Sequence, residues 1–115
     1  MNKPRYEPVY PLSRREMILL IESGDPESVA KALYAAVKYE NDWRWAQNLC
    51  VKELKSPATS IRWAAATCLG DLAFMRRPLD LDIVLPALEN ALRDPLIADP
   101  ASFSLSMVKQ FLQGK

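Results

Sequence analysis

The chain has 115 residues, of which 50% are hydrophobic and 25% charged, and its formal net charge is +1. This composition is typical of one globular domain with a modest core and is wrong for a disordered chain. The small net charge gives the whole molecule no strong attraction to nucleic acid or to an anionic membrane. No apolar run approaches the roughly 20 residues that a membrane-spanning helix needs, and residues 1–7 are too polar for a signal peptide. We therefore expect a cytoplasmic protein with no membrane partner.

The residue types present argue against an enzyme. Histidine is absent, which removes the usual nucleophile partners, the commonest general base and the commonest zinc ligand. Cys50 and Cys68 fall among apolar residues in helical patterns; they could pair, but buried free thiols are the favoured interpretation. Asp80 and Asp82 are separated by one residue, and helix capping explains them better than metal binding, because the Gly and distal Glu of a calcium loop are missing. We expect no catalytic residue, no metal and no cofactor.

The chain begins with a proline-rich stretch and then turns helical. Prolines at positions 4, 8 and 11 predict an extended N-terminal arm over residues 1–12. Ser13 and Glu16 form a capping-box pattern before an apolar run, so a first helix should begin at Ser13. Gly24 stands where a left-handed residue would end that helix. From Ser13 onward we expect a single helical domain over residues 13–115.

Two more helices follow in the first half of the chain. Asp25 and Pro26 supply an N-cap and a first-turn proline for the second helix. Asn41-Asp42 marks the start of a third helix over residues 43–55. The apolar positions that recur at helical spacing in these two helices are Val29, Leu33, Ala36 and Val37, then Trp45, Ala46, Leu49, Cys50 and Leu54.

The second half of the chain predicts three helices more. The fourth has the clearest apolar face of all, made of Ile61, Ala64, Ala65, Cys68, Leu69, Leu72 and Ala73. Asp82 is the expected cap of the fifth helix, which Asp94-Pro95 ends, and a sixth helix follows Pro100. No segment alternates with period two. The sequence therefore predicts an all-α fold of about five or six antiparallel helices.

The helices are punctuated at a regular interval. Aligning the turn that follows Leu54 with the turn that follows Leu92 gives a shift of 38 residues, and the same shift places Asp42 on Asp80. Periods of about 40 residues built from helix pairs are typical of HEAT and armadillo arrays.

Residues 61–72 and 85–95 carry a more specific resemblance. The first segment, IRWAAATCLGDL, resembles the first helix of a HEAT repeat, and the second, LPALENALRDP, resembles the second helix. The match covers residues 58–95, and the flanking helices fit one degenerate repeat and a half-repeat cap. The resemblance implies a short right-handed α-solenoid. HEAT repeats usually carry an Asp just before the β-branched residue and Arg; residues 58–60 lack it here, so we expect Arg62 to lose its partner.

The chain is also similar to small bacterial HEAT-like immunity proteins of contact-dependent growth-inhibition and polymorphic toxin systems. The features that carry this resemblance lie in residues 45–50, 62–72, 79–86 and 109–112. The resemblance implies an inhibitor that binds a cognate toxin domain, most simply a nuclease, and covers its active site. A general interaction adaptor or assembly scaffold is the second hypothesis, because the same fold serves both roles. A nucleic-acid-binding protein is the third, and it would need a basic concave surface.

Charge and tryptophan placement suggest where a partner would bind. Residues 78–99 carry five acids against Arg93, a balance of −4, so the remaining residues carry +5. If the second helices of successive repeats line the concave surface, this acidic stretch suits a basic partner; a solvated face with capping acids explains it equally well. Trp43 and Trp63 lie beside the apolar stripes, where one of them should cover a seam between helices. The expected partner-binding residues are Trp43, Arg44, Trp63, Asp80, Asp82, Glu89 and Asn90.

Overall fold

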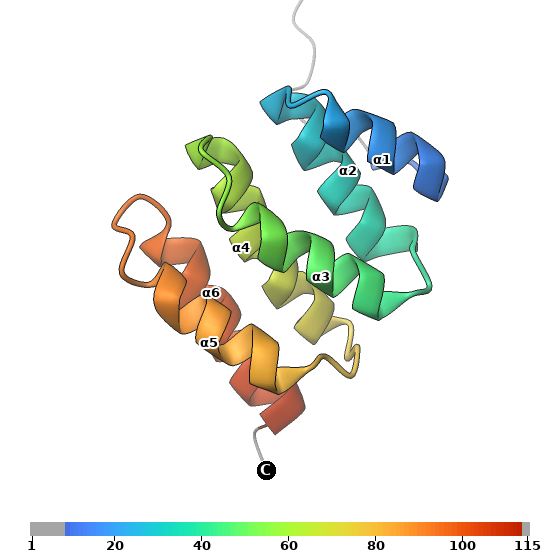
Figure 1. Cartoon of the computed structure of the whole chain (residues 1–115). Helices are drawn as coiled ribbons and strands as arrows, with labels where there is room; N and C mark the ends of the chain where they lie inside the picture. The colour runs from blue at the N-terminus through green and yellow to red at the C-terminus, as the bar shows by residue number, and fades with distance from the viewer. Residues whose placement is uncertain (1–8, 114–115) are drawn as a thin grey trace, which may run out of the picture.

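The computed structural model describes residues 9–113, which form six α-helices and a closing π-helical turn (Figure 1). Within that range there is no β-strand, and the predicted all-α class is confirmed. Residues 1–8 of the predicted arm and residues 114–115 lie outside the described part. The elements are α1 (Arg14–Glu22), α2 (Pro26–Tyr39), α3 (Trp43–Glu53), α4 (Thr59–Phe74), α5 (Leu81–Ala91), α6 (Ala98–Val108) and the π-turn η1 (Lys109–Gln113).

Local side-chain hydrogen bonds fix where the first three helices begin. At α1 the Glu16 amide donates to Ser13 Oγ (3.0 Å) while the Ser13 amide donates to Glu16 Oε1 (2.8 Å), which is the predicted capping box. Asp25 and Asp42 accept hydrogen bonds from the backbone amides three residues later at the starts of α2 and α3. Gly24 has a φ of +73°, the left-handed conformation expected after α1.

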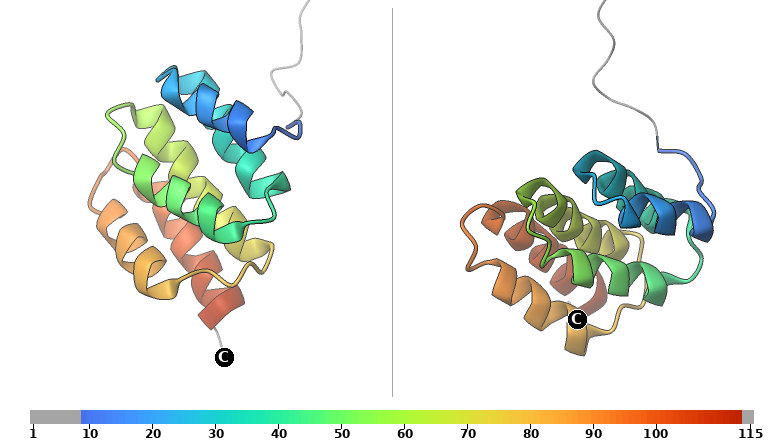
Figure 2. Two further views of the ribbon diagram at one scale, coloured as in Figure 1. Left: turned by 45° about the vertical axis from the view of Figure 1, so that its right-hand side comes forward. Right: turned by 45° about the horizontal axis from the view of Figure 1, so that its top comes forward.

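The helices form two layers. Figure 1 and Figure 2 show α1, α3 and α5 side by side in one layer and α2, α4 and α6 in the other. The extensive contacts between consecutive helices are α1 with α2, α3 with α4 and α5 with α6, so these are the three helix hairpins of the stack. The HEAT resemblance over residues 58–95 takes α4 and α5 as the two helices of one hairpin. That pairing is wrong, because α4 and α5 touch only marginally. The 38-residue shift agrees with the structure, since it superposes the start of α3 on the start of α5.

The α4 helix lies at the centre of the core. It packs against α6 most extensively, then against α2 and α3. All seven residues of its predicted apolar face are buried, and so are Ala66 and Gly70, which face the neighbouring α6. Because these residues are small, α6 approaches the α4 backbone closely, and the buried Ser104 hydroxyl of α6 donates to the carbonyl of Ala66.

The two layers are spaced differently. The helices α2, α4 and α6 are in close contact, whereas α1, α3 and α5 are separated by two grooves of about 300 and 280 Å³. The first groove lies between α1 and α3 beside Ile18 and Trp45, and the second between α3 and α5 beside Pro86 and Asn90. In a curved stack the more closely spaced layer lies on the inner side. We therefore call α2, α4 and α6 the inner layer and α1, α3 and α5 the outer layer.

This arrangement corrects one expectation about the acidic stretch. We expected the helix that carries Glu89 to line the concave surface, but that helix is α5, and α5 belongs to the outer layer. The reason is the phase of the hairpins: α5 is the first helix of its pair rather than the second. The concave surface is formed by α2, α4 and α6 instead.

A methyl group added at Gly70 should push the two central helices apart. An ideal Cβ there would lie 2.9 Å from the Cα of Ser104, which is backbone and cannot turn away. The Gly70→Ala substitution gains about 1 kcal/mol of helix propensity but incurs an overpacking cost of roughly 1–3 kcal/mol. We expect the loss to dominate, so that the urea midpoint followed by circular dichroism falls. The exposed Ser106→Ala on α6 is the matched control; a midpoint that rises for Gly70→Ala would show that α6 shifts at no cost.

Candidate functional site

Six of the seven expected partner-binding residues lie in the outer layer. Trp43 and Arg44 begin α3, Asp80 and Asp82 begin α5, and the starts of these two helices are neighbours. Glu89 and Asn90 lie farther along α5, and Asn90 borders the groove between α3 and α5. Trp63 alone lies in the inner layer, on α4. The seven residues therefore do not form one surface, and their binding role stays a prediction.

Arg44 and Asp80 pair with each other across the outer layer. Arg44 Nε donates to Asp80 Oδ2 and Arg44 Nη2 to Asp80 Oδ1, both at 3.1 Å, a bidentate arrangement. The Arg44 guanidinium also lies 4.7 Å from the centre of the Trp43 ring. The hydrogen bonds from Arg44, with a further one from Gln47, lower the pKa of the Asp80 carboxyl. The charge of Asp80 is therefore largely neutralised within the chain.

Gln47 is a buried polar residue that the sequence analysis did not single out. Its side chain is fully buried, its Oε1 accepts from the Asp80 backbone amide (2.6 Å), and its Nε2 donates to Asp80 Oδ2 (3.0 Å). Gln47 stands one turn before Cys50 on the buried stripe of α3, so helical spacing could have predicted its burial. Together these bonds attach the linker between α4 and α5 to α3.

The same contacts correct the expected cap of the fifth helix. We expected Asp82 to cap it, but α5 begins at Leu81, with Asp80 at the N-cap position and Asp82 exposed in the first turn. Asp80 makes no side-chain capping bond, because its carboxylate is held by Arg44 and Gln47. A capping role for either acid is therefore wrong.

Arg62 has a partner after all. Its Nε donates to Asp94 Oδ2 (3.1 Å) and its Nη1 donates to the carbonyls of Ser56 (2.9 Å) and Pro57 (3.2 Å). Asp94 lies in the turn after α5, in the next hairpin. It pairs with Arg62 in place of the Asp that HEAT repeats usually carry and that residues 58–60 lack. The expectation that Arg62 loses its partner is therefore wrong. When the charges of Arg44 and Arg62 are counted with the acids of residues 78–99 that they pair with, the net charge of that stretch changes from −4 to −2.

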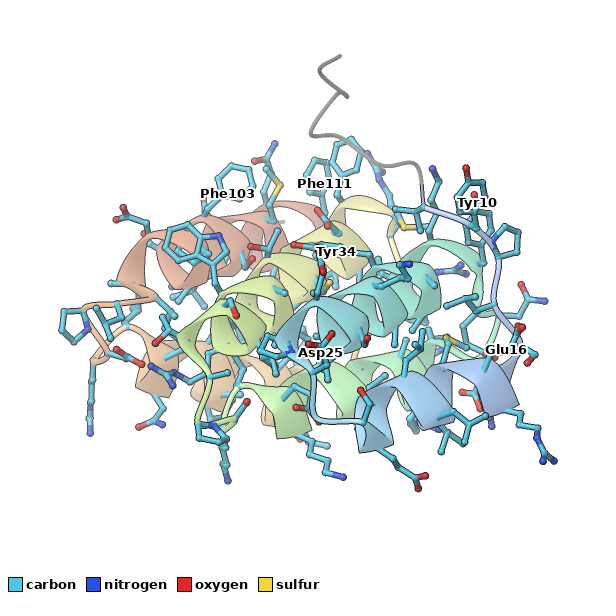
Figure 3. All side chains as sticks on the ribbon, turned by 90° about the horizontal axis from the view of Figure 1, so that it is seen from above. Tyr10, Glu16, Asp25, Tyr34, Phe103 and Phe111 are labelled. Atoms are coloured by element: carbon cyan, nitrogen blue, oxygen red, sulfur yellow. The ribbon has the colours of Figure 1, made fainter. Side chains whose placement is uncertain are left out.

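The inner layer carries exposed aromatic side chains. Figure 3 shows Tyr34, Phe103 and Phe111 on the same side of the molecule, on α2, α6 and the π-turn. Phe74 of α4 makes an edge-to-face contact with Phe111, with 5.6 Å between ring centres. Trp63 is 45% exposed, whereas Trp43 is half-buried against the core with the Arg44 guanidinium over its ring; that one of the two covers a seam between helices stays a prediction. We call the exposed Trp63, Phe74 and Phe103, together with the half-buried Tyr34 and Phe111, the aromatic face.

Asp71 is a half-buried carboxylate on the α4 helix of this layer. Burial raises its pKa, and within residues 9–113 no hydrogen bond or ion pair reaches its side chain. Burial, with smaller contributions from Cys68, Asp71 and Cys50, raises the pKa of Tyr34 to about 12. The sequence analysis missed Asp71 and the phenylalanines. The signal was present in α4, whose aromatic residues occupy the side that a surface helix normally fills with polar ones.

The remaining chemistry of the described residues is limited. Cys50 and Cys68 are free and buried, as favoured, and burial raises the pKa of the Cys68 thiol well above its usual value. Among residues 9–113 no three Cys, Asp or Glu side chains gather as metal ligands would. None of the described helices combines the length and apolarity needed to span a bilayer.

Comparison with known proteins gives one informative result. No family model and no curated protein matches the sequence. Among solved structures, a chain of the CDI complex from Cupriavidus taiwanensis LMG 19424 superposes with a TM-score of 0.82 and 30% sequence identity, over 95% of this chain and 98% of that chain. The two chains belong to one family. Membership of this family agrees with the resemblance to proteins of contact-dependent growth-inhibition (CDI) systems. No family model supports the HEAT assignment.

Replacing Gln47 with leucine should destabilise the fold without changing its shape. Leucine fills the same buried space but leaves the Asp80 amide without its acceptor, and a buried unpaired donor costs about 1–3 kcal/mol. We expect the urea midpoint to fall accordingly while the helical circular dichroism signal is kept. Lys52→Ala, on the exposed side of α3, is the control and should change the midpoint little. A Gln47→Leu variant as stable as the parent would contradict the role assigned to this hydrogen bond.

The pairing of Asp80 with Arg44 should be visible in the acid dependence of stability. The folded pKa of Asp80 lies below its unfolded value, so its contribution is present above about pH 4 and is lost as the pH falls through the lower folded pKa. In Arg44→Ala the largest cause of this shift is absent. The melting temperature of the parent should therefore fall more steeply from about pH 5 to pH 2 than that of the variant. Parallel curves would show that Asp80 owes its low pKa to other groups.

Proposed function

We propose that this chain is an immunity protein that binds and neutralises the cognate toxin domain of a contact-dependent growth-inhibition system. The observation that carries the proposal is the match to a chain of a CDI complex over nearly the full length of both chains. The fit spans all six helices rather than one hairpin, so the similarity concerns the complete domain.

In this proposal the protein acts as a stoichiometric inhibitor with no catalytic role. Three stacked hairpins present fixed surfaces, and a rigid surface loses little conformational entropy when it binds a partner. We propose a nuclease as the toxin, because a nuclease active site is built to hold phosphates and therefore attracts carboxylates. The carboxylates that we propose for such contacts are the exposed Asp82 and Glu89 in the outer layer and the half-buried Asp71 in the inner layer. The encounter would take place in the cytoplasm.

The expected binding residues enter this proposal unequally. Arg44 and Asp80 already hold each other, so replacing Asp80 would disturb the fold as well as any interface. Asp82, Glu89 and Asn90 are exposed, and their substitution tests binding more cleanly. Trp63 belongs to the inner layer, a different surface of the molecule.

The proposal is tested by recovering the partner and then using it. We expect affinity purification of the tagged protein from its native bacterium to yield, at one-to-one stoichiometry, a large protein with a C-terminal toxin domain. Expression of that domain alone in a laboratory bacterium should stop growth and degrade RNA or DNA, and co-expression with this chain should restore both. Growth arrest that persists despite co-expression of a folded, binding-competent protein would refute immunity. Degradation of no nucleic acid would refute the nuclease assignment alone.

A further inference from the structure

The outer layer shows how this chain satisfies a carboxylate beside an aromatic ring. Arg14 lies 4.5 Å from the Trp45 ring and pairs with Glu40 (3.0 Å) and Asp42 (3.3 Å). Arg44 lies over Trp43 and pairs with Asp80 in the same manner. In both places an arginine stacks on a tryptophan and neutralises an acid, an arrangement for which the flat guanidinium is well suited.

The inner layer has aromatic rings and a half-buried acid, Asp71, but among residues 9–113 no arginine pairs with that acid. Asp71 and Trp63 stand eight residues apart on α4 and Phe74 three residues further, within roughly a quarter of the helix circumference. Tyr34 stands on α2, which packs against α4. Arg76 is the nearest arginine in sequence, but its guanidinium lies 5.0 Å from the Phe111 ring and forms no ion pair with Asp71. A half-buried carboxylate without a cation is costly to keep in a folded protein.

The position and exposure of these side chains suit a binding surface. Phe74 is 63% exposed and Phe103 59% exposed, and Phe74 makes an edge-to-face contact with Phe111, so large aromatic side chains are exposed on two adjacent elements of this layer. Asp71 and Phe74 stand on α4, the middle helix of the inner layer, whereas Phe103 and Phe111 stand on α6 and the π-turn, which both pack against α4. Aromatic residues near the centre of an interface contribute most of the binding energy in many protein complexes.

We propose that the aromatic face is the surface that binds the toxin domain, and that Asp71 receives an arginine of that domain. The inference rests on the proposed function. The incoming guanidinium stacks on the rings of the aromatic face and pairs with the Asp71 carboxylate, which completes across the interface the arrangement that the outer layer completes within the chain. The exposed charges beside the aromatic face are of both signs, with Lys31 and Lys38 on α2 and Asp99 one turn before Phe103 on α6, and Asp71 differs from Asp99 in being half-buried.

The test measures the dissociation constant for the toxin domain in variants of the inner and of the outer layer. The toxin domain is the one recovered with the protein, separated from it by denaturation and then refolded. Asp71→Asn should raise the dissociation constant roughly 10- to 100-fold, because it leaves the partner's cation unpaired. Phe103→Ala should raise the dissociation constant roughly 10-fold or more. The exposed Glu22→Gln on the outer-layer helix α1 is the matched control and should stay within about threefold. Asp82→Asn and Glu89→Gln are measured beside it as tests of the outer layer as the alternative binding surface.

A stability measurement separates binding from folding. Because the Asp71 carboxylate is penalised by burial in the free protein, Asp71→Asn should leave the urea midpoint unchanged or raise it at neutral pH. Weaker binding together with undiminished stability would support a direct contact. A lowered midpoint would mean that Asp71 has a structural partner, and the inference would be wrong.

Other outcomes would overturn the inference while leaving immunity intact. Binding that survives Asp71→Asn and Phe103→Ala but is lost in Asp82→Asn would assign the toxin to the outer layer. Self-association of the free protein in analytical ultracentrifugation, abolished by Phe103→Ala, would show that a second copy covers the aromatic face. Binding of a single-stranded RNA oligonucleotide that is lost in Trp63→Ala would assign the face to nucleic acid. If the wild-type protein binds no toxin domain at all, the proposed function and this inference fail together.

Discussion

The close packing of α4 against α6 is the constraint on which the rest of the structure depends. It requires small residues where the helices meet, and Ala66, Gly70 and Ser104 supply them. Helices with small contact residues approach more closely than helices with large ones. The inner layer is therefore compact, while the outer helices stand farther apart and leave grooves between them. The difference in spacing between the layers follows from this contact, and so does the identity of the inner surface.

Polar contacts then hold the hairpins in register across the stack. Arg44 and Gln47 attach the start of α5 to α3, and Arg62 attaches the turn after α5 to the start of α4. Each joins residues more than 30 positions apart, at the two ends of the same helix. A stack whose hairpins meet mainly through apolar side chains could slide along its axis, because hydrophobic contact is not directional. Hydrogen bonds with fixed geometry at both ends of α5 prevent that sliding.

The sequence predicted those features that depend on neighbouring residues. The capping box at Ser13, the caps at Asp25 and Asp42 and the left-handed Gly24 are local, so a few residues suffice to recognise them. The buried stripes followed from helical periodicity for the same reason. The partners of Asp80 could not be predicted in this way. Its carboxylate can either cap α5 or accept hydrogen bonds from distant residues, and the outcome depends on Gln47 and Arg44, which are 33 and 36 positions away. Whether a helix forms a hairpin with the preceding or with the following helix depends on which of the two packs better against it. The apolar pattern of one helix carries no information on that choice.

The two surfaces differ in how far their charges are already satisfied, and that difference bears on where a partner gains most. In the outer layer Arg14, Arg44 and their carboxylates are paired within the chain, so a partner that engaged them would first have to replace an existing bond. A group that exchanges one partner for another gains little free energy. On the inner layer the Asp71 carboxylate and the exposed rings of Phe74 and Phe103 have no such bond to lose. Burying them against a complementary surface removes apolar area from water and supplies a missing cation in the same step. An acid left unsatisfied among aromatic rings thus favours the inner layer over the outer one, even though the outer layer carries the more acidic segment of the chain.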